Sequence, residues 1–519
     1  MVLKEINLTI PHLEYANPAQ LHQRVAAAVG MHPEELAGFQ QLRRSIDARN
    51  RSIKFNLKVV VFAKGESIAQ QHPNFQPRHF QDVTKSKHHA VVIGAGPAGL
   101  FAALRLIELG IRPIVIERGK DVRARRRDLA AINREHSVNP ESNYCFGEGG
   151  AGTYSDGKLY TRSTKRGDVN RILSTFVQFG ADADILVDAH PHIGTNCLPA
   201  IITAIREQII QSGGEVRFNA KLTDILLEGD HVRGVSINDS ENLPTTKIIL
   251  ATGHSARDIY TLLHTKGILV EAKPFAMGVR VEHPQQLINT IQYHGANAEG
   301  LPPAAYSWVE QVRGRGVYSF CMCPGGIIAP CATSPGEVVT NGWSPSKRNN
   351  PFANSGIVVP VEAEDYRDFA QFGPLAGMRY QEQLERLCCT LGGGTQTAPA
   401  QRLTDLVAGK TSQSLPTNSY QPGTVPVNLA NALPQAMVGR LRDGFRSIGG
   451  KMRGYLTEEA VAVAIESRTS SPVRIPRSAD GQHPQIKGLY PCGEGGGFAG
   501  GIVSAAIDGE WSAGMVDIL

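Results

Sequence analysis

The feature that most constrains this chain is a short apolar strand that runs directly into a glycine-rich turn and a helix. Val91-Val92-Ile93 precedes Gly94-Ala95-Gly96-Pro97-Ala98-Gly99, and Pro97 to Leu109 has the composition of a helix. In such a unit the first glycine permits the tight turn, the second lets a pyrophosphate approach the backbone, and the third allows close helix–strand packing. The free N–H groups at the helix start attract phosphate. The pattern predicts a dinucleotide-binding βαβ unit.

A carboxylate follows at the expected distance. The next apolar stretch, Ile114–Ile116, ends in Glu117, 18 residues after Gly99. A carboxylate there can accept hydrogen bonds from both ribose hydroxyls of an adenosine, whereas the alternative is a surface glutamate at a strand end. Because strand, helix and spacing agree, we expect these residues to contact a dinucleotide: Gly94, Gly96, Pro97, Ala98, Gly99, Glu117 and Arg118.

A second glycine-rich segment near the C-terminal end indicates which dinucleotide is bound. An extended stretch ends in Gly493-Glu494, and Gly495 to Gly501 then leads into a helix. In a flavin site such an acid can bind hydroxyl groups of the cofactor. A second helix N-terminus can face the edge of the flavin ring where negative charge grows on reduction. An apolar strand that ends in Ala251-Thr252-Gly253 adds a third segment. We therefore expect FAD.

At this point the chain resembles a known family. It is similar to the bacterial FAD-utilizing dehydrogenases, also called NAD(P)/FAD-dependent oxidoreductases, of the glutathione-reductase-like flavoprotein superfamily. The segments that carry this resemblance span nearly the whole chain: Arg44–Arg49, Phe146–Leu159, Thr252–Asp258, Lys273–Glu282, Cys321–Gly326, Glu466–Ile475 and Gly488–Ser504. The resemblance implies one bound FAD and a redox function, but it names no substrate.

The resemblance also implies roles for individual residues. The first glycine-rich turn and Glu117 would hold the adenosine and pyrophosphate, Leu222 would present backbone groups to the adenine, and Gly253 would close the pocket. Glu494 takes the place of the acid that binds the ribityl or ribose side. Further cofactor contacts are expected from the ring-side loops and their neighbours: Gly149, Gly150, Gly152, Thr153, Ala251, Thr252, Gly493, Gly500, Gly501 and Ile502.

The order of motifs predicts an α/β fold in which a Rossmann-like FAD-binding domain, a βαβ unit plus a three-stranded β meander, is interrupted by a mixed α+β substrate domain. A small N-terminal α/β unit precedes it, with a helix from Pro18 to Val29 and a second helix from Pro33 to Asn50. The expected divisions are residues 1–63 for the N-terminal unit, 64–88 for a linker, 89–269 and 451–519 for the two parts of the FAD-binding domain, and 270–450 for the substrate domain.

Three residues are candidates for catalysis. His254 follows Ala-Thr-Gly directly and could donate a proton; alternatively it starts a helix, since Ser255 to Asp258 resembles a capping box. Arg468 could bind a carboxylate substrate or the flavin through its guanidinium, or form a loop salt bridge. Arg348 is a candidate on similar grounds.

The eight cysteines indicate neither a disulfide scaffold nor a metal site. Cys145 has no second cysteine nearby of the kind that disulfide reductases need, because the next is Cys197. No Cys-x-x-Cys pair is present, so we expect no metal. Cys321-Met322-Cys323 leaves two interpretations open, a redox-active pair beside a flavin or a strand that carries two packed thiols, of which the second is simpler.

The overall charge gives little indication of a macromolecular partner. The net charge is +5, and the densest basic run is Arg123 to Arg127. No aromatic residues interleave with it for base stacking, so we expect a solvated helix face near the FAD phosphates and no nucleic-acid partner. Charges interrupt the first residues, and no apolar run approaches the roughly 18 residues of a membrane span, so we expect a cytoplasmic location without membrane contact.

These observations predict an FAD-dependent oxidoreductase, a dehydrogenase that moves a hydride via flavin N5 on a small organic substrate. No second strand–GxGxxG–helix unit is found, so NAD(P)H would bind only transiently, or the organic substrate would reduce the flavin directly. Two alternatives remain: a flavin-dependent RNA-modifying protein, and a flavoprotein with structural FAD in which residues 1–63 recruit a partner. The sequence leaves the substrate and the oligomeric state open.

Overall fold

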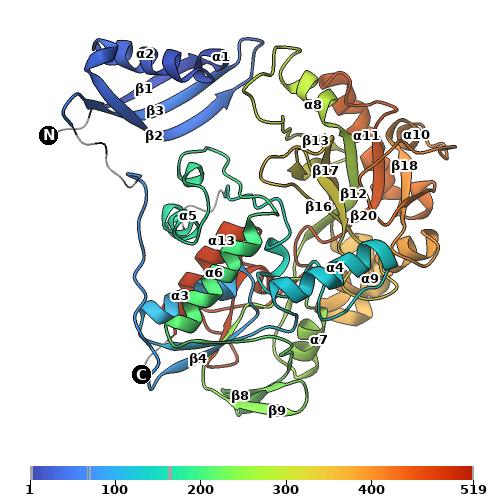
Figure 1. The fold of residues 1–519 in the computed structure, drawn as a ribbon. Coiled ribbons are helices and arrows are strands. Elements are labelled where there is room, and N and C mark those ends of the chain that lie inside the picture. The colour runs from blue at the N-terminus through green and yellow to red at the C-terminus, as the bar shows by residue number, and fades with distance from the viewer. Residues whose placement is uncertain (1–3, 67, 69–71, 162–165, 517–519) are drawn as a thin grey trace.

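The computed structural model describes residues 4–66, 68, 72–161 and 166–516. Three sheets organise the chain: an N-terminal antiparallel sheet, a parallel sheet covered by helices, and a large second sheet (Figure 1). The N-terminal sheet stands apart from the other two at one end of the molecule, and the C-terminal end of the chain lies beside the parallel sheet (Figure 1).

The N-terminal unit is a three-stranded antiparallel sheet in the order β1-β3-β2, with two helices on it. The Asn17 carboxamide accepts the N–H groups of Ala19 and Gln20 and so begins the longer helix, which ends at Gly30 in the left-handed region. Its elements are β1 (Lys4–Pro11), α1 (His12–Tyr15), α2 (Pro18–Val29), β2 (Leu36–Asp47) and β3 (Lys54–Ala63).

The second helix predicted for this unit, Pro33 to Asn50, is wrong. Only Pro33–Glu35 forms a single 3-10 turn, and the rest is β2, which pairs with β3 along its length. Leu36, Phe39 and Leu42 have helical spacing in the sequence, but the hydrogen bonds to β3 outweigh that local pattern because local preferences are weak compared with tertiary pairing.

Residues 64–88 contain no helix or strand among those that the structure describes; residues 67 and 69–71 of this predicted linker lie outside them. Arg78 is nonetheless buried, with Nε donating to Glu108 at 2.8 Å and Nη1 pairing with Glu510 at 2.6 Å. This arginine attaches the segment to two helices of the parallel sheet.

The parallel sheet has the strand order β22-β10-β4-β5-β6. Two of its helices, α3 and α13, touch backbone to backbone, since a Cβ on Gly509 would lie 2.1 Å from the carbonyl oxygen of Ala98. The strands are β4 (His89–Ile93), β5 (Arg112–Ile116), β6 (Glu215–Arg217), β10 (Ile248–Leu250) and β22 (Leu489–Pro491). The helices are α3 (Pro97–Glu108), α4 (Val122–Glu135), α5 (Val169–Gln178), α6 (Leu198–Gln211), α7 (Arg257–Thr265), α12 (Gly493–Gly496) and α13 (Ile502–Gly514).

A separate three-stranded antiparallel sheet leads from β6 back to β10. It consists of β7 (Leu222–Glu228), β8 (His231–Ile237) and β9 (Glu241–Pro244). Its third strand, β9, is short and mostly exposed.

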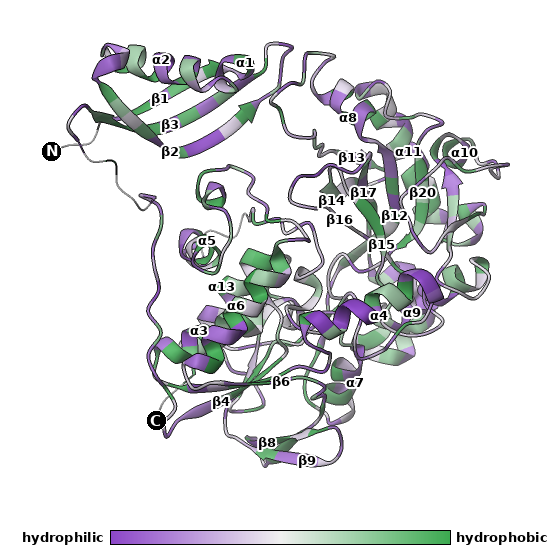
Figure 2. Ribbon diagram, viewed as in Figure 1, coloured by the Kyte–Doolittle hydropathy of each residue, from purple (hydrophilic) through white to green (hydrophobic). Residues whose placement is uncertain are grey.

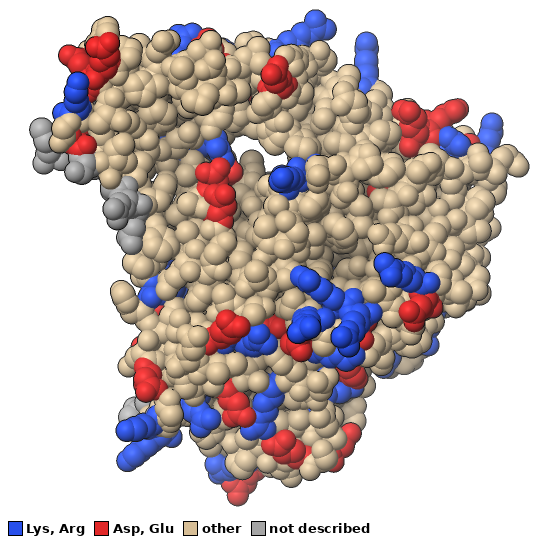
Figure 3. Space-filling view, viewed as in Figure 1, with Lys and Arg blue, Asp and Glu red and all other residues tan. Residues whose placement is uncertain are grey.

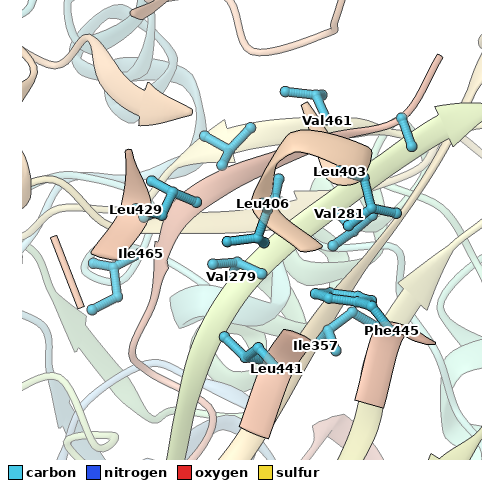
Figure 4. Close-up of a cluster of buried hydrophobic side chains, with 14 of the residues drawn as sticks. Val279, Val281, Ile357, Leu403, Leu406, Leu429, Leu441, Phe445, Val461 and Ile465 are labelled. Atoms are coloured by element: carbon cyan, nitrogen blue, oxygen red, sulfur yellow. The ribbon is translucent and has the colours of Figure 1, made fainter. Parts of the chain in front are cut away.

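The second sheet has seven strands in the order β13-β14-β17-β12-β20-β18-β19. Hydrophobic residues gather in its central strands (Figure 2), and helices α10 and α11 cover one face with Leu403, Leu406, Leu441 and Phe445 (Figure 4). The strands are β12 (Phe275–Pro284), β13 (Val309–Val312), β14 (Arg315–Cys323), β17 (Phe352–Val361), β18 (Ala398–Arg402), β19 (Thr424–Pro426) and β20 (Val461–Glu466). The helices are α8 (Gln285–Gln292), α9 (Ala376–Leu391), α10 (Leu403–Ala408) and α11 (Gln435–Lys451).

Two small ribbons complete the fold: β11 (Glu271–Ala272) pairs with β21 (Val473–Arg474), and β15 (Ile327–Pro330) pairs with β16 (Thr340–Trp343). The predicted limits of the domains stay predictions, with one correction. Residues from 451 onward were assigned to the FAD-binding domain, but β20 pairs with β12 and β18 of the second sheet. None of the described helices is both long and apolar enough to cross a membrane.

Candidate functional site

The carboxyl ends of four parallel strands bring the predicted cofactor residues to one edge of the sheet. Strands β22, β10, β4 and β5 run in register side by side. Glu494, Thr252, the Gly94–Gly99 turn and Glu117 each follow one of them. In open parallel sheets, ligands bind at this edge.

The three glycines of the first turn have different surroundings. Gly94 has φ +101°, and a Cβ there would lie 2.5 Å from the Ala251 carbonyl oxygen. A Cβ on Gly99 would lie 1.9 Å from the Gly94 carbonyl oxygen. A Cβ on Gly96, by contrast, would have only the Gly150 Cα near it, at 3.9 Å. Two glycines are therefore needed for packing, while Gly96 borders open space at the N-terminus of α3, which no side chain caps.

A second loop, Gly149–Thr153, lies against the same helix N-terminus. A Cβ on Gly150 would lie 3.1 Å from Gly96 Cα, and one on Gly152 would lie 3.3 Å from Pro97 Cγ and 3.4 Å from Ile502 Cγ1. The starts of α3 and α13 and this loop thus meet at one place. The fold brings together residues that are far apart in the sequence and were assigned to the same cofactor.

Arg125 of α4 holds this loop in place, a role that the sequence did not reveal. Its fully buried guanidinium donates to three backbone carbonyls, those of Asn143 at 2.8 Å, Glu148 at 2.9 Å and Gly150 at 2.9 Å. The buried Glu148 carboxylate in turn accepts the Val122 N–H at 2.8 Å, at the start of α4.

The run Arg123 to Arg127 is therefore only partly the solvated face that the sequence predicted. Arg123, Arg126 and Arg127 are exposed, and basic side chains gather over α4 (Figure 3), but Arg125 points into the protein.

The Glu117 carboxylate already links both glycine-rich loops. Its Oε2 accepts the Ala95 N–H at 2.9 Å, and its Oε1 accepts the N–H groups of Gly119 and Gly147, each at 2.9 Å. Carboxylate oxygens have further lone pairs, so contact with ribose stays a prediction.

The two other residues assigned to the adenosine side lie close by. Arg118 pairs with Asp258 at 2.5 Å and lies 4.5 Å from the centre of the Phe146 ring. The Ala220 N–H donates to the Glu117 carbonyl, which places the start of β7, and with it Leu222, beside this region.

The second half of the site lies around Glu494. Its Oε2 is 3.0 Å from His254 Nδ1, and His254 Nε2 is 3.2 Å from the Arg468 carbonyl oxygen. The Glu494 carboxylate and the Arg468 carbonyl thus lie at the two nitrogens of this ring and fix its orientation. The capping box predicted from Ser255 to Asp258 is wrong, because α7 begins after Ala256 without a side-chain cap.

Close backbone approaches join the two halves. A Cβ on Gly493 would lie 2.8 Å from Ala98 Cβ, and one on Gly495 would lie 2.8 Å from the Gly253 carbonyl oxygen. The Gly493 N–H donates to Asp508 of α13 at 2.7 Å. A Cβ placed on Gly500 or Gly501 would have no neighbouring atom within 4 Å, and no side chain caps α13.

The site fits FAD by its own chemistry. Open space at Gly96 beside an uncapped helix suits a pyrophosphate, because backbone N–H groups and the helix dipole favour anions there. The buried Thr252 Oγ1, directly after β10, has no hydrogen-bond partner among the described residues and is free to contact a ligand.

Arg468 is buried in a cluster of charges rather than open to a substrate. Its guanidinium binds Glu385 and Glu337 at 3.0 Å each and donates to Thr333 Oγ1 at 2.7 Å. Burial opposes ionisation of Glu385, but Arg257 and Arg468 outweigh it and hold the pKa of this carboxyl at about 2. The structure favours the salt-bridge interpretation of Arg468.

Arg348, the third catalytic candidate, pairs with the buried Asp156 at 2.9 Å, and Lys158 pairs with the same carboxylate at 2.9 Å. Arg348 also lines a cavity of about 2100 Å³ between the N-terminal unit and the rest of the molecule, which is visible as an opening in Figure 3.

Among the described residues, no group of three or more His, Cys, Asp or Glu is arranged to hold a metal.

Comparison with known proteins agrees with this site. Residues 87–242 match the family described as FAD binding domain, residues 274–469 match the family described as FAD-dependent protein, C-terminal domain-like, and residues 2–62 match a domain of unknown function. The chain is 39% identical over 505 residues to a protein of Clostridium beijerinckii that is described as uncharacterized, with 94% of each chain covered. A thiamine thiazole synthase of Aeropyrum pernix is 25% identical over 181 residues, 32% of this chain and 54% of that protein.

Similar solved structures include the halogenase PltM in complex with phloroglucinol and FAD. It is 12% identical, with 82% of this chain and 67% of that chain covered and a TM-score of 0.35. A geranylgeranyl bacteriochlorophyll reductase-like protein from Thermoplasma acidophilum is 11% identical, with 82% and 77% covered and a TM-score of 0.34. The two FAD domain matches show that the chain is an FAD-dependent enzyme. The Clostridium beijerinckii match shows that the chain belongs to the same family as that protein.

Proposed function

We propose that the protein is an FAD-dependent dehydrogenase of the glutathione-reductase-like superfamily that acts on a small organic substrate. The observation that supports this most is the meeting of three segments, the starts of α3 and α13 and the loop Gly149–Thr153, at the carboxyl edge of the parallel sheet. When bound, FAD supplies hydride transfer at its N5 atom, and the protein supplies orientation and charge.

The two halves of the site have separate tasks in this proposal. The backbone at Gly96 binds the pyrophosphate, and Glu117 orients the ribose while it fixes both glycine-rich loops. Glu494 binds the ribityl side. The backbone N–H groups at Gly501 and Ile502 face the ring edge, where a helix N-terminus stabilises negative charge.

His254 holds the proton in this proposal. The Glu494 carboxylate lies 3.0 Å from its Nδ1, and the Arg468 carbonyl oxygen lies 3.2 Å from its Nε2, so the ring is fixed in orientation at the second half of the site. A positioned imidazole of this kind can transfer a proton to or from a reacting group.

The substrate in this proposal is an organic anion that enters through the large cavity. The cavity is lined by six cationic side chains, Arg44, Arg49, Arg51, Arg348, Lys451 and Arg453, against the three carboxylates of Asp47, Asp188 and Glu310. An excess of positive charge in a concave site raises the local concentration of anions. Arg348 connects this cavity to Asp156, which follows the Gly149–Thr153 loop in the chain.

Anaerobic mixing of the FAD-loaded protein with NADH, NADPH and a panel of organic acids tests the proposal. We expect one of these donors to bleach the flavin absorbance. Bleaching by an organic acid should be faster at low than at high salt. Should no donor bleach the flavin, the FAD would be structural, and the proposed dehydrogenase function would fail.

A further inference from the structure

The two cysteines at the end of β14 face the same cation. In a regular strand, residues two apart share a face, but here the pairing of β14 with β17 is interrupted between Phe320 and Cys323, and Cys321 has φ +49°. Even so, Lys158 Nζ lies 3.9 Å from Cys321 Sγ and 3.5 Å from Cys323 Sγ. A single ammonium group therefore contacts both sulfurs.

A second cation completes the surroundings of the pair. Arg280 Nη2 donates to the Cys321 carbonyl oxygen at 2.7 Å and lies 3.7 Å from Cys323 Sγ. This guanidinium is fully buried, and its Nη1 donates to Glu466 at 3.0 Å while its Nε donates to Asn354 at 2.8 Å. Two positive groups held in this way stabilise a thiolate, which is the reactive form of cysteine.

The two thiols differ in ionisation and in accessibility. The hydrogen bond from Cys323, together with Lys158 and Arg280, holds the pKa of Cys321 well below its ordinary value, and the same hydrogen bond and burial raise the pKa of Cys323. Cys321 is exposed and Cys323 is buried. The pair thus consists of one accessible and one buried cysteine beside the same two cations.

We propose that Cys321 and Cys323 form a thiol–disulfide exchange site, with Cys321 as the attacking and Cys323 as the resolving cysteine. The substrate class is a low-molecular-weight disulfide. This redox site goes beyond the proposed dehydrogenase function and does not depend on it.

The exchange runs in two balanced steps. The Cys321 thiolate attacks one sulfur of the disulfide, so that a mixed disulfide forms and one thiolate leaves. Cys323 then gives up its proton and attacks the Cys321 sulfur, and the second thiol leaves with that proton. The two cysteines end as a disulfide, and their two electrons reduce the added disulfide to one thiolate and one thiol, of which the thiolate takes up a proton from solvent.

Reaction of the fully reduced, FAD-loaded protein with oxidised glutathione tests the site. Mass spectrometry of the peptide that contains both cysteines should show the loss of two hydrogens. In Cys323→Ser the reaction should stop at a glutathione adduct on Cys321, and in Cys321→Ser neither product should form on that peptide. Cys197→Ser serves as the control and should react like the wild type, because Cys197 has no such cation contacts. A Cys323→Ser variant without a lasting adduct would overturn the proposal.

The pH dependence of alkylation gives a second test that needs no variant. The groups that face Cys321 are Cys323, Lys158, Arg280, Asp156 and Glu466. Iodoacetamide should modify Cys321 in the wild type faster than Cys197 at neutral pH, with a half-maximal rate below the ordinary thiol pKa of about 8.5. A rate that follows an ordinary thiol would contradict the proposal. Lys158→Met should move the half-maximal rate to higher pH, because one of the two cations beside the thiolate is lost, and Lys158→Arg should restore most of the shift.

Discussion

Arg125 Nη2 donates to the carbonyl oxygen of Gly150 at 2.9 Å, and Gly150 in turn lies against Gly96 at the start of α3. A buried arginine on a helix outside the sheet therefore sets the position of the loop that covers the phosphate-binding turn. Loss of this arginine should therefore affect cofactor retention, although Arg125 acts on the site only through the loop that contains Gly150.

Arg125→Met should loosen that loop and destabilise the protein. Three carbonyl groups lose their donor, and each buried polar group left without a partner costs ~1–3 kcal/mol, so the free energy of unfolding should fall by about 3 kcal/mol or more. FAD retention after gel filtration should fall in parallel. Arg123→Met, an exposed change on the same helix, should leave both quantities unaltered. Equal effects of the two substitutions would argue against the role given to Arg125.

Gly96→Val should release FAD while the fold persists. The structure has room for a Cβ at this position, since only Gly150 Cα lies within 4 Å of it, but the side chain would extend into the space where the pyrophosphate would lie. The flavin absorbance per protein should drop to near zero after desalting, with a circular dichroism spectrum like that of the wild type. Gly450→Val, on the exposed part of α11, is the matched control. A variant of Gly96 that keeps its full flavin absorbance would show that the turn does not bind the cofactor.

Glu494→Ala should weaken FAD binding and shift the flavin potential. The change removes the carboxylate proposed to bind the ribityl side, and the loss of one charge-assisted hydrogen bond to FAD is worth roughly tenfold in affinity. It also removes the contact with His254 Nδ1. Potentiometric titration and equilibrium dialysis measure the two effects. Glu459→Ala, a change to an exposed glutamate, should have neither. If binding and potential both stay at wild-type values, the second half of the site has been assigned to the wrong residue.

Glu282 should make stability depend on pH near neutrality. This carboxyl is buried on β12 and accepts the Ser419 N–H at 2.7 Å, and burial raises its pKa to about 7. Because the folded-state pKa lies above the unfolded value, the stabilisation is complete at acidic pH and is lost as the pH rises through about 7, by about 3 kcal/mol in total.

Thermal unfolding across that pH range, in the wild type and in Glu282→Gln, measures this contribution. The variant cannot ionise at this position, so its unfolding temperature should fall less steeply with rising pH. Glu459→Gln should follow the wild-type curve. Identical slopes in Glu282→Gln and the wild type would refute the assignment.

The sequence predicted those parts of the fold that local patterns determine. The βαβ unit around Gly94–Gly99 was predicted because its glycines, apolar strand and helix are adjacent in the chain. The helix ending at Gly30 was predicted for the same reason. By contrast, Leu36–Asp47 forms a strand because β3 pairs with it, and the spacing of its own apolar residues does not indicate that pairing.

The candidate site, like the fold, could be predicted from the sequence only in part. The first glycine-rich turn was assigned to a dinucleotide from its residues and spacing, and the loop Gly149–Thr153 through the family resemblance; the structure brings the two together. The partners of charged residues could not be predicted, because an ion pair depends on which side chains the fold places in reach. Arg468, which follows β20, pairs with Glu385 of α9; Arg125 donates to carbonyl groups instead of facing solvent; and Lys158 contacts two thiols of the second sheet.

The packing of α13 on α3 through Gly509 has a consequence for biosynthesis. The first turn of the phosphate-binding unit precedes the second sheet in the chain, whereas β22, α12 and α13, which complete its pocket, follow that sheet. The pocket therefore stays incomplete during translation until these three elements have been made, and the nascent polypeptide cannot retain its coenzyme before then.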